Sequence, residues 1–208
     1  MKIAILGAEC TGKTTLLLAL AGLLKPAHPS LVIVPEFLRE WCDTHGRTPR
    51  AEEQTHIVRM QMQGVCAHPS ASMVLSDTAP LMTAIYSDLI FGDPSLYAEA
   101  ITHHRTFDLT LVAGLDLHWT EDGFQRDGVV MRARVNQRLR DVLTRHGIAF
   151  STVYGSGDAR TQSAMQAIGY ALGKPVPDAQ RSHWKWPCEK CSDPACEHRL
   201  FSDLLQNA

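Results

Sequence analysis

The stretch that decides the fold of this chain is Gly7-Ala8-Glu9-Cys10-Thr11-Gly12-Lys13-Thr14. It fits the pattern G-x-x-x-x-G-K-[ST], which average amino-acid frequencies would produce by chance in roughly 1% of chains of this length. Residues 2–6 before it form an apolar, strand-like run, and residues 14–24 after it read as a helix. Because a phosphate-binding loop connects a strand to a helix, this context predicts a P-loop that binds a nucleotide.

The residue types of this loop match the chemistry of phosphate binding. Gly7 and Gly12 allow bare backbone N–H groups to curl around phosphate oxygens at a helix N-terminus. We expect Lys13 to reach the β- and γ-phosphates as a catalytic residue, and the Thr14 hydroxyl to bind Mg²⁺. The other residues expected to line the ATP site are Ala8, Glu9, Cys10, Thr11 and Thr15.

Short apolar runs alternate with helical segments along the next part of the chain. The runs are residues 2–6, 31–34, 73–76, 109–113 and 148–153, and the expected helices are 14–24, 51–67, 80–90, 95–105, 129–146 and 158–172. This alternation predicts an α/β fold with a doubly wound parallel sheet of about five strands and helices on both faces. We expect residues 1–172 to form the nucleotide-binding domain and residues 173–208 to form a linker and tail.

Composition, charge and length disfavour several classes of protein, among them nucleic-acid-binding and membrane proteins. The 208 residues carry a net charge of −2, so no basic field favours nucleic acid. The sequence shows neither a signal peptide nor a membrane span, and we expect a cytoplasmic protein with no membrane partner. A guanine-reading Asn/Thr-Lys-x-Asp motif is missing, which disfavours a GTPase, and the chain is too short for the helical subdomain of a remodelling ATPase.

Two acidic residues follow expected strands at the edge where a doubly wound sheet binds its ligand. Asp77 ends the run 73–76, where an acid that holds Mg²⁺ is expected, although it could also cap the next helix. Glu36 follows the run 31–34 and could take the proton of an attacking hydroxyl. Nearby, Arg39 could hold the acceptor, and Trp41 could stack on its ring. The alternatives are a solvated helical turn for Glu36 and Arg39, and plain packing for Trp41.

The polar segment 116–128 has neither helical nor strand periodicity and is a candidate lid. Arg126 and Arg132 lie in or near it. A guanidinium pairs with phosphate oxygens bidentately, so these two arginines are candidates for stabilising the transferring phosphoryl group. Of the two, Arg126 is the better candidate for a catalytic role.

Several motifs together resemble one known family. They are the loop from Gly7 to Thr15, Pro-Glu-Phe-Leu-Arg-Glu at 35–40, Asp-Thr-Ala-Pro-Leu at 77–81 with Thr83 and Tyr86, and Trp-Thr-Glu-Asp-Gly at 119–123. Over residues 1–172 the chain resembles the ribosylnicotinamide kinase domain of NadR-type proteins, a P-loop family of AAA type.

The resemblance implies phosphorylation of a ribose hydroxyl with ATP and Mg²⁺, which would convert nicotinamide riboside to its mononucleotide in NAD biosynthesis. It also implies that Trp119 and Asp122 belong to the lid and contact the acceptor. The family pattern has a second acid where this chain has Ala79. That departure keeps an alternative open, an ATP-binding regulatory switch that hydrolyses ATP slowly and interacts through its tail.

The tail carries a pattern typical of structural zinc. Its residues Cys188, Cys191, Cys196 and His198 are spaced C-x₂-C-x₄-C-x-H. Cys₃His is a common tetrahedral zinc set, and metal binding would stabilise a tail too short for a core of its own. His183 could replace His198, and free thiols or a redox site are the alternatives. Basic and acidic residues balance in 181–208, which disfavours a nucleic-acid partner.

Overall fold

The structure is a computed structural model that describes residues 1–118 and 128–173. The described part lies within one compact unit, Met1–Lys174. Its centre is a sheet of five parallel strands in the order β2-β3-β1-β4-β5. The strands are β1 (Lys2–Leu6), β2 (Leu31–Val34), β3 (Met73–Asp77), β4 (Leu109–Ala113) and β5 (Ser151–Val153). The predicted α/β fold with a doubly wound parallel sheet is therefore confirmed.

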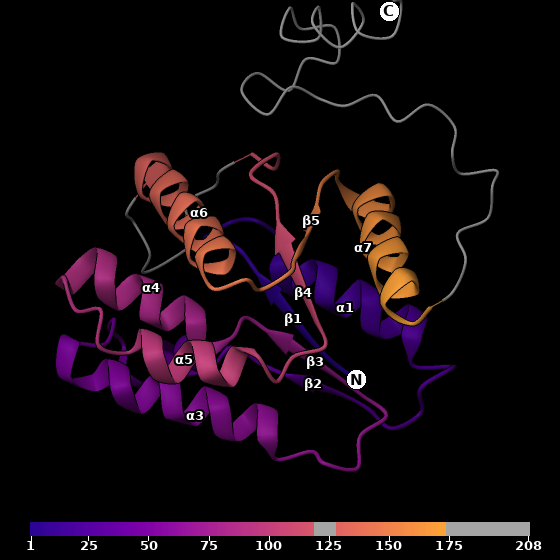
Figure 1. Cartoon of the computed structure of the whole chain (residues 1–208), viewed down its shortest axis with the longest axis horizontal. Helices are drawn as coiled ribbons and strands as arrows, with labels where there is room; N and C mark the ends of the chain where they lie inside the picture. Colours follow the sequence, from indigo (N-terminus) through magenta and orange to yellow (C-terminus); the bar gives the residue numbers. More distant parts are fainter. Residues whose placement is uncertain (119–127, 174–208) are drawn as a thin grey trace, which may run out of the picture. The chain divides into compact units, whose positions relative to one another are not determined.

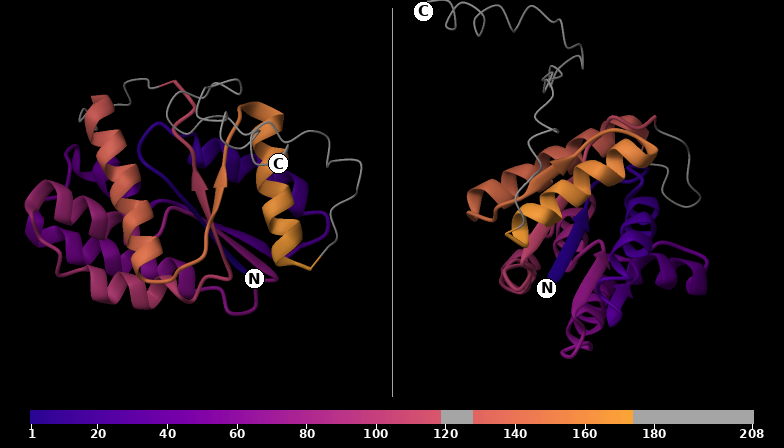
Figure 2. Two further views of the ribbon diagram at one scale, coloured as in Figure 1. Left: turned by 45° about the horizontal axis from the view of Figure 1, so that its top comes forward. Right: turned by 90° about the vertical axis from the view of Figure 1, so that its right-hand side faces the viewer.

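Helices cover both faces of this sheet (Figures 1 and 2). On one face lie α1 (Lys13–Leu24) and α7 (Gly157–Ala171), whose apolar side chains pack together with those of β1 and β3. The other face carries α3 (Gln54–Cys66), α4 (Pro80–Phe91), α5 (Tyr97–His104) and α6 (Gly128–Arg145). Because both faces are covered, the strands are apolar runs rather than alternating ones.

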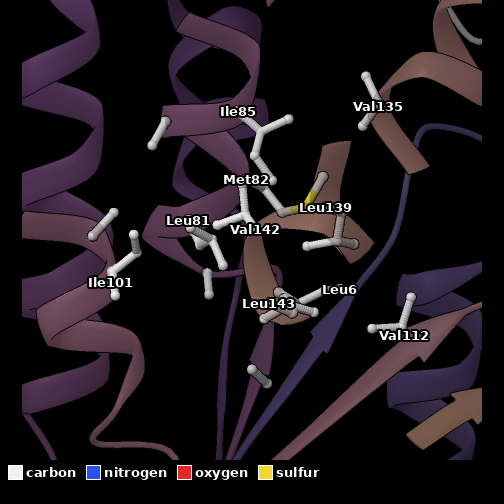
Figure 3. Packing of buried hydrophobic residues seen from close by; sticks show 14 of the residues in the cluster. Leu6, Leu81, Met82, Ile85, Ile101, Val112, Val135, Leu139, Val142 and Leu143 are labelled. Atoms are coloured by element: carbon white, nitrogen blue, oxygen red, sulfur yellow. The ribbon is translucent and has the colours of Figure 1, made fainter. Parts of the chain in front are cut away.

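The larger core cluster joins α4 and α6 to the sheet (Figure 3). Met82 and Ile85 of α4 meet Leu139 and Leu143 of α6 over Leu6 of β1. On α6, Val135, Leu139 and Leu143 recur at a spacing of four residues, and all three are buried. This packing fixes the second half of α6 over the end of β1, where the phosphate loop begins.

Three elements differ from the sequence expectation. The segment after β2 forms helix α2 (Phe37–His45), which the sequence did not predict. Its C-cap residue is Gly46, where φ is +66°. Residues 51–67, expected as one helix, form a short 3₁₀ turn, Ala51–Glu53, followed by α3. The fifth strand begins at Ser151 rather than at residue 148, because the Ile148 N–H donates to the Leu143 carbonyl and closes the end of α6.

Asp88 of α4 joins this helix to α5 through a hydrogen bond and to α6 through an ion pair. Its carboxylate accepts hydrogen bonds from Tyr97 of α5, at 2.9 Å, and from Arg138 of α6. Burial and this contact raise the pKa of Tyr97 to about 12. Arg138 thus helps to hold α6 against α4.

Candidate nucleotide-binding and phosphoryl-transfer site

The loop between β1 and α1 has the backbone of a phosphate cradle. Gly7 has a φ of +152° and Gly12 a φ of +70°. A Cβ atom on Gly7 would lie 2.9 Å from the Thr11 hydroxyl, and one on Gly12 would lie 2.9 Å from a methyl of Leu117. Only glycine fits both positions, as the motif predicts. The N-terminus of α1 has no side-chain cap, so its first N–H groups are available to an anion.

Lys13 lies over this loop. Its Nζ donates a 2.9 Å hydrogen bond to the Ala8 carbonyl, which also accepts from the Thr11 hydroxyl at 2.8 Å. These two bonds fold the loop around a common oxygen and hold the ammonium group at its mouth. The position suits a lysine that would contact terminal phosphates.

Asp77 and Thr14 meet at the end of β3. The Thr14 hydroxyl donates to Asp77 Oδ2 at 2.5 Å. Asp77 is only 4% exposed, and its Oδ1 is buried with no hydrogen-bond partner in the described part of the chain. A hydroxyl and a carboxylate with a free oxygen form the hard-oxygen donor pair that Mg²⁺ prefers. The two residues predicted to bind Mg²⁺ are thus neighbours, and they fit that ion.

Glu36 lies just after the end of β2, the strand next to β3. It is the N-cap residue of α2, and its side chain is 14% exposed, with an Arg39 Nε atom 3.6 Å away. Burial raises the pKa of Glu36, and Asp77 adds to the rise, while Lys13 and Arg39 oppose it. Lys13, Glu36 and Asp77, predicted from three separate segments, therefore act on one another electrostatically.

Gln61 of α3 fixes the backbone on both sides of Glu36. Its Oε1 accepts from the Phe37 N–H at 2.8 Å, and its Nε2 donates to the Pro35 carbonyl at 3.2 Å. This buried glutamine was missed from the sequence, where one polar residue on a long helix carries no signal of its role. It holds the start of α2 against α3.

Trp41 is buried on α2. Its indole stacks on His45 at 3.9 Å between ring centroids, and the Arg47 guanidinium lies 4.8 Å from its ring. Trp41 and His45 border a cavity of about 550 Å³ that Phe37 and His56 also line. Trp41 thus packs within its own helix and against Arg47, and its predicted contact with an acceptor stays a prediction.

Arg132 of α6 reaches back to the phosphate loop. Its Nη2 donates to the Leu117 carbonyl at 2.9 Å and lies 3.5 Å from the carbonyls of Cys10 and Leu115. The side chain is buried, and Nε has no hydrogen-bond partner within the described ranges. The arginine predicted to bind phosphate therefore lies at the loop, held by carbonyl oxygens.

Arg160 of α7 was not predicted at all. It is 3% exposed and donates to the carbonyls of Thr11 and Gly155, at 2.9 and 2.8 Å, and to Asp116 Oδ1 at 3.0 Å. A sequence signal existed, because Arg160 shares a stripe with the buried Ala164 and Ile168, where a charged residue needs partners.

Glu9 does not face the phosphate cradle. Its side chain is 7% exposed, and its Oε2 accepts a 2.8 Å hydrogen bond from the hydroxyl of Tyr86 on α4. The sequence placed Glu9 with the ATP-binding residues because it belongs to the motif. The backbone of Glu9 lies in the loop, whereas its carboxyl group turns toward α4.

The remaining predicted site residues lie outside the described residues. They are Trp119, Asp122 and Arg126 of the candidate lid, and Cys188, Cys191, Cys196 and His198 of the tail. Among residues 1–118 and 128–173, no group of three or more His, Cys, Asp or Glu side chains could hold a metal ion. Within those ranges, no helix is long and apolar enough to cross a membrane.

Comparisons with known proteins agree with this architecture. Residues 2–160 match the model of a protein family described as AAA domain. No curated protein matches the chain closely enough to count as a relative.

Solved structures similar to the chain include the NadR protein in complex with NAD and AMP-PNP, at 17% identity and a TM-score of 0.65. The NadR protein in complex with NR is 20% identical, with a TM-score of 0.68. These matches cover 85% of this chain but only 50% and 52% of the NadR chains, so this chain spans about half their length. A deoxyadenosine kinase from M. mycoides is 14% identical, with a TM-score of 0.58 over 82% of this chain and 100% of that one. These likenesses show the P-loop NTPase fold.

Proposed function

The chain belongs to the AAA domain family, and we propose that it is an ATP-dependent kinase that phosphorylates a ribose hydroxyl of a nucleoside. Nicotinamide riboside is the acceptor that we propose first. The motifs described above support this acceptor, as does the structural likeness to the NadR protein in complex with NR. The deoxyadenosine kinase of similar fold supports a nucleoside acceptor more generally.

The observation that carries the proposal is the environment of Glu36. A carboxyl group at the end of the second strand, close to the phosphate loop, can take the proton of an attacking hydroxyl. Here the Glu36 side chain is only 14% exposed, Lys13 and Asp77 act on it electrostatically, and burial raises its pKa. A base with a raised pKa accepts a proton from a hydroxyl more readily than an ordinary carboxylate does. In the proposed reaction, Glu36 deprotonates an alcohol that attacks the γ-phosphate held at Lys13.

The proposed reaction balances with these groups. The acceptor oxygen forms a bond to the γ-phosphorus of ATP, its proton passes to the Glu36 carboxylate, and the bond from that phosphorus to the β–γ bridging oxygen breaks to leave ADP. Lys13 and the N–H groups of the loop stabilise the charge on the phosphoryl oxygens. Thr14 and Asp77 would hold Mg²⁺, which neutralises charge on the β- and γ-phosphates when bound.

Ala79 favours the second candidate, a slow ATPase that acts as a switch. This residue caps the start of α4 with no side-chain hydrogen bond and is fully buried, so it offers no carboxyl group to an acceptor. Glu36 serves either candidate, because a carboxylate can also position the attacking water of an ATPase. The Pro-Glu-Phe-Leu-Arg-Glu element at 35–40 and the candidate lid favour the kinase.

One assay separates the two candidates. ATP consumption is measured alone and with nicotinamide riboside, other ribonucleosides or deoxyadenosine, and Lys13→Ala serves as the control for contaminating enzymes. A nucleoside that raises ATP turnover at least 10-fold in the wild type but not in the control supports the kinase. If no nucleoside raises turnover, the kinase proposal fails and the slow ATPase is favoured.

A further inference from the structure

The carboxyl group of Glu9 has an unused hydrogen-bonding atom. Oε2 accepts from Tyr86, but Oε1 is buried and has no hydrogen-bond partner in the part of the chain that the structure describes. A buried polar atom left without a partner costs about 1–3 kcal/mol, so native proteins rarely keep one without a reason. A ligand that donates a hydrogen bond to Oε1 would remove this cost.

The phosphates of ATP cannot be that ligand. Phosphate oxygens and a carboxylate are both hydrogen-bond acceptors, and their negative charges repel each other. The loop N–H groups and Lys13 supply the hydrogen-bond donors of the phosphate cradle, and the Glu9 carboxyl group supplies no further donor. A hydrogen-bond donor for Oε1 would therefore have to come from a group other than phosphate.

The Glu9 side chain is directed toward α4. It is held by Tyr86 on α4, which begins three residues after Asp77. Helix α4 packs against α3, and α3 carries the Gln61 that fixes the backbone around Glu36. The Glu9 side chain and the backbone on both sides of Glu36 are thus each held by one of two adjacent helices.

Because this inference rests on the proposed kinase function, it concerns the acceptor of that reaction. We propose that Oε1 of Glu9 accepts a hydrogen bond from a ring hydroxyl of the acceptor, one that is not itself phosphorylated. Tyr86 positions the carboxyl group by holding its other oxygen. Glu9 then selects nucleosides with an intact ribose over deoxynucleosides, because a deoxy acceptor leaves Oε1 buried without a donor.

The test compares acceptors that differ by one hydroxyl. Values of kcat/KM are measured for nicotinamide riboside and adenosine, and for the 2′-deoxy and 3′-deoxy forms of each. The wild type is expected to prefer the ribonucleoside over at least one deoxy form by about 10- to 100-fold. Methionine is similar in length to glutamate but has no acceptor oxygen. In Glu9→Met, the ratio of kcat/KM between the ribonucleoside and its deoxy form should therefore fall to about one, because the KM for the ribonucleoside rises.

Tyr86→Phe supplies the second variant. It keeps the Glu9 carboxyl group but removes the hydroxyl that orients it, so the preference should shrink without vanishing. Thermal unfolding verifies that both variants are folded, and the comparison of acceptors in the wild type does not depend on either of them.

Two different failures can be told apart. If the wild type phosphorylates deoxynucleosides as well as ribonucleosides, or if folded Glu9→Met keeps the preference, the role of Glu9 is overturned while the kinase proposal stands. If the wild type phosphorylates none of these acceptors, the kinase proposal fails and the role of Glu9 fails with it.

Discussion

Arg160 donates a 2.9 Å hydrogen bond to the carbonyl oxygen of Thr11, although 149 positions separate the two residues in sequence. The same guanidinium binds the Gly155 carbonyl and Asp116, and Asp116 Oδ2 accepts from the Gly155 N–H at 2.5 Å. One side chain therefore ties the phosphate loop to the ends of β4 and β5. The shape of the cradle depends on α7 as well as on its own glycines.

Replacing Arg160 should destabilise the protein and loosen the loop. In Arg160→Met, Oδ1 of Asp116 and the carbonyl of Thr11 lose the donor that Arg160 supplies, so we expect the free energy of unfolding to fall by about 3 kcal/mol or more. Urea unfolding measures the change, and the KM for ATP should rise. Arg59→Met is the matched control, because its arginine is exposed and pairs only loosely with Glu99, at 3.9 Å. If the free energy of unfolding falls no more in Arg160→Met than in Arg59→Met, the role of Arg160 is contradicted.

Glu36→Gln should separate catalysis from nucleotide binding. A glutamine keeps the size of the side chain but cannot take a proton, so kcat should fall by about 100-fold or more while ATP binding is kept. Glu40→Gln, on the exposed face of the same helix, should change kcat little. Unchanged turnover in Glu36→Gln would remove this residue from the role of base.

The pH profile tests the same residue in the wild type. Glu36 must be deprotonated to act as a base, so kcat/KM should fall as the pH drops through its pKa. Burial raises that pKa above the usual 4.5, so the acid limb should lie above pH 4.5. An acid limb at or below 4.5 would show that another group is responsible.

His104 should make stability depend on pH. It is 1% exposed, its Nε2 pairs with the Thr110 hydroxyl at 2.9 Å, and burial, aided by His103, lowers its pKa from 6.5 to about 4. Between these values the unfolded chain binds the proton and the folded chain does not, so stability falls as the pH drops from 6.5 toward 4. Between pH 7 and pH 5, His104 should lower the free energy of unfolding by about 2 kcal/mol.

Urea unfolding at the two pH values measures this dependence. His104→Gln should reduce it by about the stated amount, whereas His56→Gln, at an exposed position, should leave it unchanged. Equal pH dependence in all three proteins would show that His104 titrates normally.

The tail prediction can be tested on the full chain. If Cys188, Cys191, Cys196 and His198 form a zinc site, the purified protein should contain about one equivalent of zinc. Cys188→Ser should lose most of it, whereas Cys66→Ser, at an exposed cysteine of the nucleotide-binding part, should keep it. Purified wild type without zinc would refute the site.

Local sequence patterns were sufficient for the framework. The five apolar runs became the five strands, within three residues at each end, because strands buried on both faces must be apolar throughout. The phosphate loop was equally clear, since close contact with phosphate needs glycine at two fixed positions and a lysine after them. Helix α2 was missed because its nine residues include only a few buried side chains, such as Trp41 and Cys42.

The sequence by itself determined the P-loop, the parallel sheet and the candidates Lys13, Glu36 and Asp77, because each of these features depends on residues adjacent in the chain. Only the tertiary structure decided where Glu9 and Arg160 point. Their partners, Tyr86 and Thr11, lie 77 and 149 positions away. A buried polar group takes whichever partner the packing of helices brings within about 3 Å. That distance depends on how α4 and α7 pack against the sheet, and no local pattern records it.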